Sequence, residues 1–233
     1  MTDLIVAAEA AELVRRATQW LAQEMAGAIA ERGSCGVCLA GGRTPEPVYR
    51  ALAAESGIDW ERVDVFFTDE RAVPPAHPDS NYRMVRQALL SRVPIPPARV
   101  HRMEAERADR DAAARDYAQA LPARLDVIVL GIGQDGHTAS LFPRSPAMDE
   151  RRLVVPVVGA KPPAERLTIT PPVIGRARRV AMVATGADKA VMVARAIEGP
   201  DDPKAVPAQL ARQGSWFLDE AAAAGLAARK AGR

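Results

Sequence analysis

Apolar residues follow two different spacings along the chain, and these spacings predict alternating helices and strands. Residues 7–31 repeat apolar side chains at helical spacing, which predicts a long amphipathic helix that ends at Gly33. Short continuous apolar runs, typical of strands buried on both faces, follow at intervals. Strands are predicted at residues 35–39, 63–67, 100–105, 125–133, 153–158 and 179–185.

Further helices are predicted at residues 44–56, 81–93, 107–120, 188–199 and 215–227. Thr44 is expected to cap the first of them, with Pro45 in its first turn, and Ser80 and Asn81 to cap the second. This alternation predicts an α/β fold, in which helices cover both faces of a doubly wound, mainly parallel, Rossmann-like sheet. Because no repeat or flexible linker interrupts the pattern, one domain is expected over residues 1–233.

The composition is that of an ordinary globular protein, with 48% apolar and 26% charged residues. The formal net charge of +2 predicts no nucleic-acid partner. The N-terminal residues lack the pattern of a secretory signal, and no apolar run approaches the ~20 residues of a membrane helix. We therefore expect a cytoplasmic protein without a membrane partner.

Cys35 and Cys38 form a C-x-x-C motif, which raises the question of a redox or metal site. A redox pair normally lies at a helix N-terminus, whereas these cysteines fall within a predicted buried strand. A zinc site would need a second pair of ligands, and the sequence offers none. Both cysteines are therefore expected to be buried packing residues, and no metal is expected.

Polar residues suited to chemistry follow three of the predicted strands, at residues 40–45, 68–74 and 131–143. In a parallel sheet, ligands bind outside the carboxyl ends of the strands. We therefore expect these three loops to meet at one edge of the sheet.

The third loop contains Gly131, Gly133 and Gly136, which match the G-x-G-x-x-G spacing of a dinucleotide-binding turn. A dinucleotide site also needs a long helix after the third glycine. Pro143 and Pro146 would end any helix here after about one turn. The spacing therefore does not predict a nicotinamide or flavin cofactor.

The same loop continues with Asp135 and His137. A short helix beginning near Asp135 would place His137 in its first turn, where the positive end of the helix dipole would keep the imidazole neutral. A neutral imidazole can act as a general base. The alternative is a histidine that serves capping or packing, but only this one of the three histidines follows a glycine turn after a strand.

The first loop, Gly41, Gly42, Arg43 and Thr44, joins a strand to a helix. Backbone N–H groups at such a turn can bind phosphate, and Arg43 would add charge. An ordinary strand-to-helix turn would have the same spacing.

The second loop contains Asp69, Glu70 and Arg71. Arg71 would suit an anion or a developing oxyanion, although a salt-bridged loop end explains the same residues.

Three segments taken together, AGGRTP, FFTDERAVPPAHPDSNYRMVRQALL and VLGIGQDGHTASLFP, resemble the 6-phosphogluconolactonase family. ERLTITPPVI, GADKA and WFLDEAA extend the resemblance over nearly the whole chain. The resemblance implies hydrolysis of 6-phospho-D-glucono-1,5-lactone in the oxidative pentose phosphate pathway, without a metal or organic cofactor. The expected partner is this sugar-phosphate lactone, and the expected assembly is a monomer or weak homodimer.

The resemblance also implies roles for individual residues. Gly41, Gly42, Arg43 and Thr44 would hold the 6-phosphate, where many members of the family carry serine in place of Arg43. Arg166 and Lys189 would add positive charge to the same site.

The catalytic roles follow in the same way. His137 would take a proton from water, and Asp135, Asp69 or Glu70 would orient the imidazole or the water. Arg71 or backbone N–H groups would stabilise the oxyanion.

Two other functions remain possible at this point. Glucosamine-6-phosphate deaminases resemble the chain in the DGH motif, but they continue with Phe-Asn-Glu-Pro where this chain has Ser140 to Pro143, and they place tyrosine at the position of Arg71. A non-catalytic sugar-phosphate-binding module of a transcription regulator would normally carry a DNA-binding domain. We expect none, because the first predicted helix already belongs to the core fold.

Overall fold

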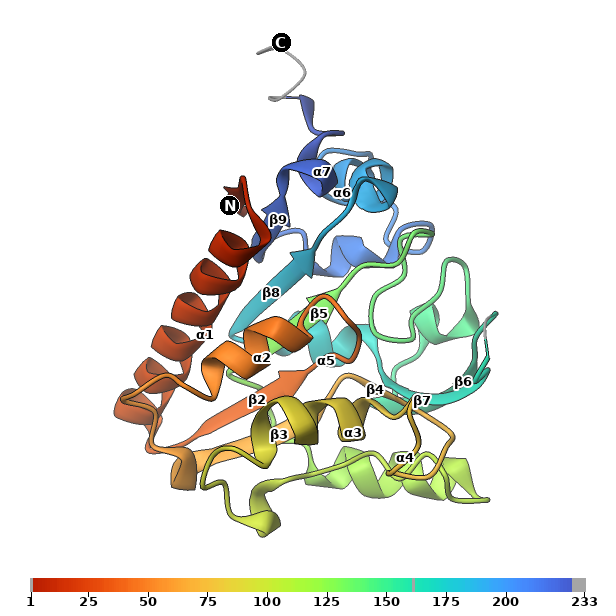
Figure 1. Cartoon of the computed structure of the whole chain (residues 1–233). Helices are drawn as coiled ribbons and strands as arrows, with labels where there is room; N and C mark the ends of the chain where they lie inside the picture. The colour runs from red at the N-terminus through yellow and green to blue at the C-terminus, as the bar shows by residue number, and fades with distance from the viewer. Residues whose placement is uncertain (1, 161, 228–233) are drawn as a thin grey trace.

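A six-stranded parallel sheet forms the centre of the computed structural model, which describes residues 2–160 and 162–227 (Figure 1). Its strand order is β1-β9-β8-β5-β2-β3. Its strands are β1 (Asp3–Ala7), β9 (Ser215–Asp219), β8 (Arg179–Ala184), β5 (Val127–Gly131), β2 (Cys35–Leu39) and β3 (Val63–Phe67). The continuous apolar runs explain this arrangement, because side chains on both faces of β5 and β2 are buried.

A smaller antiparallel sheet lies beside the first, in the order β4-β7-β6. Its strands are β4 (Asp69–Arg71), β7 (Glu165–Ile169) and β6 (Val154–Val158). Register pairs Arg71 with Arg166 and Asp69 with Thr168. Two arginines distant in sequence are therefore neighbours across a pair of strands.

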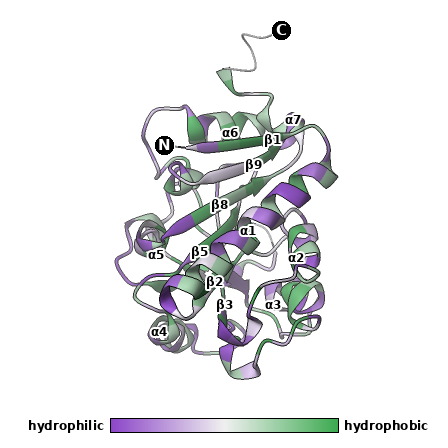
Figure 2. Cartoon of the chain, turned by 90° about the vertical axis from the view of Figure 1, so that its left-hand side faces the viewer, coloured by the Kyte–Doolittle hydropathy of each residue, from purple (hydrophilic) through white to green (hydrophobic). Residues whose placement is uncertain are grey.

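Helices cover both faces of the large sheet; Figure 2 shows α1 and α2 on one side and α5 on the other. The helices are α1 (Ala10–Arg32), α2 (Glu46–Leu52), α3 (Asn81–Val85), α4 (Arg110–Ala120), α5 (Pro171–Arg176), α6 (Ala190–Ile197) and α7 (Glu220–Ala223). Gly33 ends α1 in the left-handed conformation, with φ of 80°, as expected for a glycine C-cap. No helix in the described ranges is long and apolar enough to span a bilayer.

The predicted fold class is confirmed, but several predicted elements are wrong. Residues 215–219 form strand β9 rather than the start of a helix, because Trp216 and Phe217 are buried between β8 and β1. Residues 100–105 form no strand, and only an isolated bridge joins Val100 to Val65. The strands β1, β4 and β7 were not predicted.

The cap predicted for α2 is also wrong. Its N-cap is Pro45, and no side chain accepts a hydrogen bond there, so Thr44 lies outside the helix. The cap predicted for α3 is confirmed, since the Ser80 hydroxyl accepts a hydrogen bond from the backbone N–H of Arg83. The single domain expected over the whole chain stays a prediction, although one hydrophobic cluster includes residues from both sheets.

Cys35 and Cys38 are free thiols within β2, and both are fully buried. Burial, aided by the nearby Asp126 carboxylate, raises the pKa of Cys35 to about 12. Burial also raises the pKa of Cys38 well above its usual value. This environment fits packing residues and opposes thiolate chemistry.

We therefore predict that neither thiol reacts with Ellman's reagent in the native protein at pH 8, because the reagent needs an accessible thiolate. The measurement is the absorbance of released thionitrobenzoate, with and without guanidinium chloride. Two thiols per chain should react only after unfolding. Fast reaction of the folded protein would contradict the assignment.

Candidate active site

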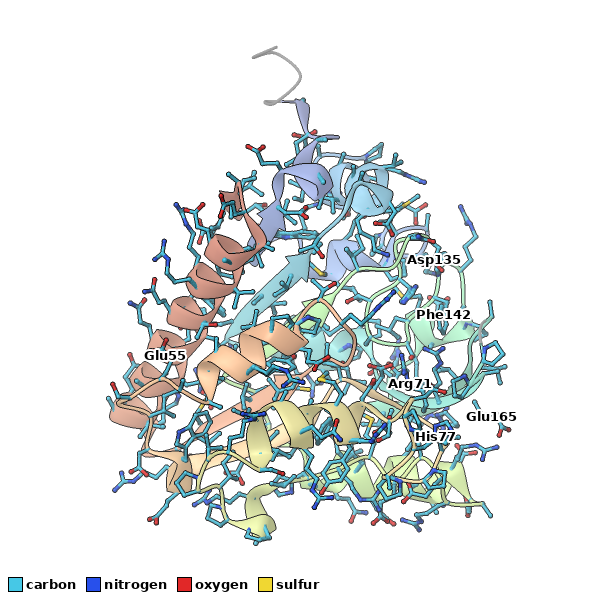
Figure 3. All side chains as sticks on the ribbon, in the orientation of Figure 1. Glu55, Arg71, His77, Asp135, Phe142 and Glu165 are labelled. Atoms are coloured by element: carbon cyan, nitrogen blue, oxygen red, sulfur yellow. The ribbon has the colours of Figure 1, made fainter. Side chains whose placement is uncertain are left out.

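A cavity of about 200 Å³ lies at the carboxyl ends of β2, β3, β5 and β8. It brings the three predicted loops together, as expected for a parallel sheet. Every predicted site residue lines it except Glu70 and Asp135; the lining members are Gly41, Gly42, Arg43, Thr44, Asp69, Arg71, His137, Arg166 and Lys189. In Figure 3, Arg71 of β4 lies on the same side of the molecule as Asp135 and Phe142, which both belong to the loop after β5.

The loop after β5 carries His137 in a turn, so the helix expected near Asp135 is not formed. The backbone N–H of Gly133 donates to the carbonyl of His137 at 2.8 Å, and the N–H of Gly136 donates to Gly133 at 3.0 Å. Gly136 has φ of 86°, which favours glycine. The predicted helix dipole therefore cannot act on His137, and its orientation comes from other contacts.

Asp135 supplies one such contact. Its Oδ1 lies 2.5 Å from His137 Nδ1 and also accepts a hydrogen bond from the backbone N–H of His137. Burial alone would raise the pKa of Asp135. The interactions with His137 together have the larger effect, so the pKa of Asp135 lies below its usual value. Because an ionised carboxylate only accepts hydrogen bonds, the proton of this contact lies on Nδ1, which leaves Nε2 as the lone-pair nitrogen of the neutral tautomer.

Gly133 allows this pair to form. A methyl group on Gly133 would lie 2.1 Å from His137 Nδ1 and 2.6 Å from Asp135 Oδ1. Both distances are too short for non-bonded atoms. Glycine is therefore required beside the imidazole because no side chain fits there.

Asp69 is buried, with 5% of its surface exposed, and it is held by hydrogen bonds from several segments. Its Oδ2 accepts a hydrogen bond from the Ser140 hydroxyl at 2.6 Å. Its Oδ1 accepts from the Asn81 side chain at 3.2 Å and from the Thr68 hydroxyl at 3.1 Å. The carboxylate is therefore fixed at the wall of the cavity.

Three cationic side chains, Arg71, Arg166 and Lys189, line the same cavity as this carboxylate. Arg71 donates from Nη1 to the Asp79 carbonyl at 2.8 Å, while its buried Nε has no hydrogen-bond partner within residues 2–160 and 162–227. Burial lowers the pKa of Arg166, and the neighbouring Arg71 adds to this effect while Asp69 opposes it. Lys189 adds a third cation, which pairs with Asp188 at 3.2 Å. Such a cluster suits an anionic ligand.

The glycine turn after β2 forms another part of the cavity wall, next to Asn81. A methyl group on Gly41 would lie 1.8 Å from the Asn81 side-chain oxygen, so only glycine fits there. Gly42 has φ of 105°. Arg43 is exposed at this turn, and the Thr44 hydroxyl lies 3.5 Å from the Thr185 hydroxyl.

Glu70 plays a different part from its neighbours. Its two oxygen atoms accept hydrogen bonds from the backbone N–H groups of Arg71, Asn81 and Tyr82 and from the Ser80 hydroxyl. Burial raises its pKa, although these four hydrogen bonds oppose the change. The carboxyl group therefore fastens the start of α3 to β4, away from the cavity.

Sequence reasoning missed three residues that shape the site. Asn81 and Ser140 hold Asp69, and Thr185 lines the cavity. Asn81 was interpreted only as part of a helix cap. The sequence signal that could have indicated Ser140 is its position, three residues after His137 in the same loop. Across the described ranges, no group of three or more His, Cys, Asp or Glu side chains could hold a metal ion.

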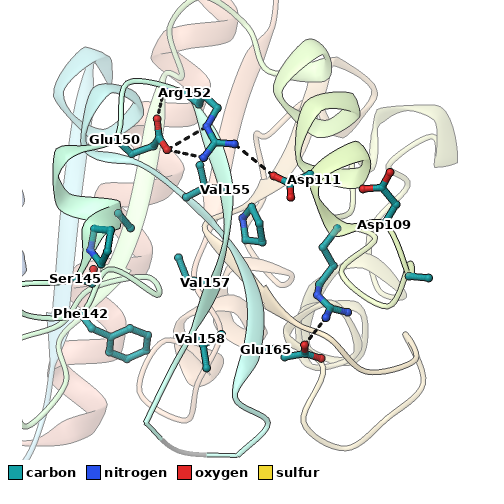
Figure 4. Close-up of a pocket in the computed structure, with 15 residues that line it drawn as sticks. Asp109, Asp111, Phe142, Ser145, Glu150, Arg152, Val155, Val157, Val158 and Glu165 are labelled. Atoms are coloured by element: carbon teal, nitrogen blue, oxygen red, sulfur yellow. Dashed lines mark hydrogen bonds and ion pairs between the residues drawn. The ribbon is translucent and has the colours of Figure 1, made fainter.

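A larger cavity, of about 660 Å³, lies between α4 and β6 (Figure 4). Both arginines in its lining are paired with carboxylates: Arg152 with Glu150 and Asp111, and Arg110 with Glu165. The lining therefore offers an anion no unpaired positive charge. None of the predicted site residues lines it.

A cationic cavity with an aspartate–histidine pair, at the carboxyl edge of a Rossmann-like sheet, is typical of α/β enzymes that act on small anionic ligands. The family model described as glucosamine-6-phosphate isomerases/6-phosphogluconolactonase matches residues 8–218. The chain belongs to this family.

Similar proteins and structures agree with the family. The 6-phosphogluconolactonase of Synechocystis is 41% identical, covering 90% of this chain and 92% of its own. That of Streptomyces coelicolor is 40% identical, covering 96% and 94%. The crystal structure of 6-phosphogluconolactonase from Thermotoga maritima has a TM-score of 0.85 at 27% identity, covering 94% of this chain and all of that one. A monomeric glucosamine-6-phosphate deaminase, at 22% identity and a TM-score of 0.83, shares the fold.

We predict that Glu70→Gln lowers the free energy of unfolding by about 1–3 kcal/mol, because an amide NH₂ would face donors that now bind a carboxyl oxygen. Urea unfolding followed by circular dichroism measures this change. Glu61→Gln, at an exposed position, is the matched control and should change stability by less than about 0.5 kcal/mol. Equal stability of the two variants would argue against the fastening role.

Proposed function

We propose that this protein hydrolyses 6-phospho-D-glucono-1,5-lactone to 6-phospho-D-gluconate, in the oxidative pentose phosphate pathway. One observation carries the proposal: a single cavity holds both a cation cluster and an imidazole paired with a carboxylate. The relatives named 6-phosphogluconolactonase, at about 40% identity over nearly their full length, support it.

In this proposal the phosphate end of the lactone binds first. The backbone N–H groups of residues 41–44 and the side chains of Arg166 and Lys189 bind the phosphate oxygens. Arg43 adds charge at the exposed side of this turn. An anchored phosphate places the C1 carbonyl beside His137. The reaction is then faster, because the carbonyl, the water and the base are already held in a productive geometry.

Hydrolysis then proceeds through the imidazole. His137 Nε2 takes a proton from a water molecule as the water oxygen forms a bond to C1. Asp135 keeps the proton on Nδ1 and stabilises the imidazolium that forms. The C1–ring oxygen bond then breaks, and the imidazolium returns its proton to that oxygen. The product carboxylic acid releases its own proton to the solvent.

Arg71 is our choice for stabilising the oxyanion, because its side chain lines the same cavity as His137. Asp69 limits the repulsion between Arg71 and Arg166 and orients the water. The deaminase alternative gains no support from the site, because Phe142 offers no carboxyl group for ring opening.

The remaining expectations belong to the same proposal. We propose that the reaction needs no metal or organic cofactor and takes place in the cytoplasm, where the two free thiols would stay reduced. We propose a monomer or weak homodimer. The large exposed apolar side chains in the described ranges, Leu4, Val158 and Val191, come from three different elements rather than one strand or helix.

We predict that the purified protein releases acid from fresh phosphogluconolactone much faster than buffer alone, and that His137→Ala lowers kcat by about 10²–10⁴-fold. A pH-stat measures both rates. Affinity for 6-phosphogluconate should change little, because the phosphate contacts remain. His101→Gln, which alters a histidine paired with Asp64, is the control and should keep the wild-type rate. A wild-type rate equal to buffer would refute the proposed activity.

We predict that Lys189→Met raises KM about tenfold while kcat changes less than twofold, because a charged hydrogen bond to the bound phosphate is lost. Lys204→Met is the matched control, since Lys204 is exposed and pairs with Asp149. Initial rates over a range of lactone concentrations give both constants. An unchanged KM would remove Lys189 from the phosphate site.

A further inference from the structure

Phe142 separates the two cavities described above. Its side chain lines the larger cavity, as Figure 4 shows, whereas His137 and Arg166 line the smaller one. The centroid of its ring lies 5.1 Å from that of the His137 imidazole, with 50° between the planes. The Arg166 guanidinium carbon lies 5.6 Å from the same ring centroid. One aromatic ring therefore contacts both the candidate base and a candidate phosphate ligand.

The backbone of Gly159 packs closely against one side of this ring. A methyl group on Gly159, at the end of β6, would lie 2.9 Å from Phe142 Cζ and 3.2 Å from Arg166 Nε. The backbone of Gly159 is buried against both groups. Because Gly159 has no side chain, the backbone just after β6 can pack closely against the ring and against the Arg166 side chain.

Each contact has a physical consequence. The face of an aromatic ring attracts a partly desolvated cation, which favours one position of the Arg166 guanidinium. Tilted contacts between rings favour one orientation of the imidazole. Asp135 fixes His137 at Nδ1, and a second contact on the ring limits rotation about that hydrogen bond.

We propose that Phe142 is a positioning residue that holds the His137 imidazole and the Arg166 guanidinium in their working orientations. The expected effects on kcat and KM rest on the proposed lactone hydrolysis, but the contact between Phe142 and His137 does not. Loss of the ring should therefore affect both catalysis and phosphate binding, although Phe142 itself reacts with nothing.

The test replaces the ring while keeping an apolar side chain, in Phe142→Leu. We expect kcat to fall about tenfold because the base is less well oriented, and KM to rise about 3- to 10-fold because Arg166 loses its aromatic contact. The affinity for inorganic phosphate, measured by calorimetry, should fall by the same factor as KM rises. A merely structural defect would lower the amount of active enzyme without this paired change.

NMR gives a readout that does not depend on activity. The chain has three histidines, so the imidazole signals can be assigned individually. Phe142→Leu should shift the signals of His137 and leave those of His101 unchanged. Phe66→Leu is the matched control, because Phe66 stacks on His101 with centroids 4.5 Å apart. It should shift His101 alone and leave kcat and KM unchanged.

Gly159→Ala provides a second variant in case Phe142→Leu does not fold. Its methyl group should displace the Phe142 ring, because it would lie 2.9 Å from Cζ. We expect this displacement to shift the His137 signals and to lower kcat. Unshifted His137 signals in the folded variants, or kcat and KM within twofold of wild type, would overturn the proposal. If the wild-type protein does not open the lactone, the proposed function fails, while the NMR and phosphate measurements still decide the role of Phe142.

Discussion

The hydrogen bonds of the buried Asp69 carboxylate are the interactions on which the cavity depends. Its hydrogen bonds come from Ser140 in the loop after β5, from Asn81 at the start of α3 and from its own neighbour Thr68. An ionised group out of water is costly unless its oxygen atoms are satisfied. These segments therefore cannot separate without leaving the carboxylate unpaired, and the two sheets are held at the distance that the site requires.

That carboxylate also explains how the site can concentrate positive charge. The pairing of β4 with β7 sets Arg71 opposite Arg166, and burial makes the repulsion between two cations costly. Asp69 offsets part of this cost in the free protein. An anionic ligand would offset more of this cost, so the same arrangement favours the binding of an anion. Phe142 belongs to this balance, because its ring contacts Arg166 on another side.

Steric limits decide the placement of the imidazole. Gly133 leaves room for the pair between His137 and Asp135, and Gly41 leaves room for Asn81. Neither glycine is needed for an unusual backbone angle of its own; each is needed because another side chain occupies the space of a Cβ atom. A sequence pattern shows such glycines but not the neighbours that require them. For this reason the G-x-G-x-x-G spacing alone does not distinguish a dinucleotide turn from this one, in which the second glycine leaves room for His137.

The sequence by itself determined the class of fold, the C-terminal end of α1 at Gly33 and the burial of the two cysteines, because these depend on the local pattern of apolar residues and on glycine. The start of α1 was predicted three residues too early, because Ala7 pairs into β1. It also indicated which loops carry the site, since parallel strands place their carboxyl ends at one edge. Only the tertiary structure decided that residues 215–219 form a strand, that Glu70 faces away from the cavity, and that Arg71 meets Arg166. The physical reason is that strand pairing and buried hydrogen bonds join residues far apart in the chain, and no local pattern specifies such partners.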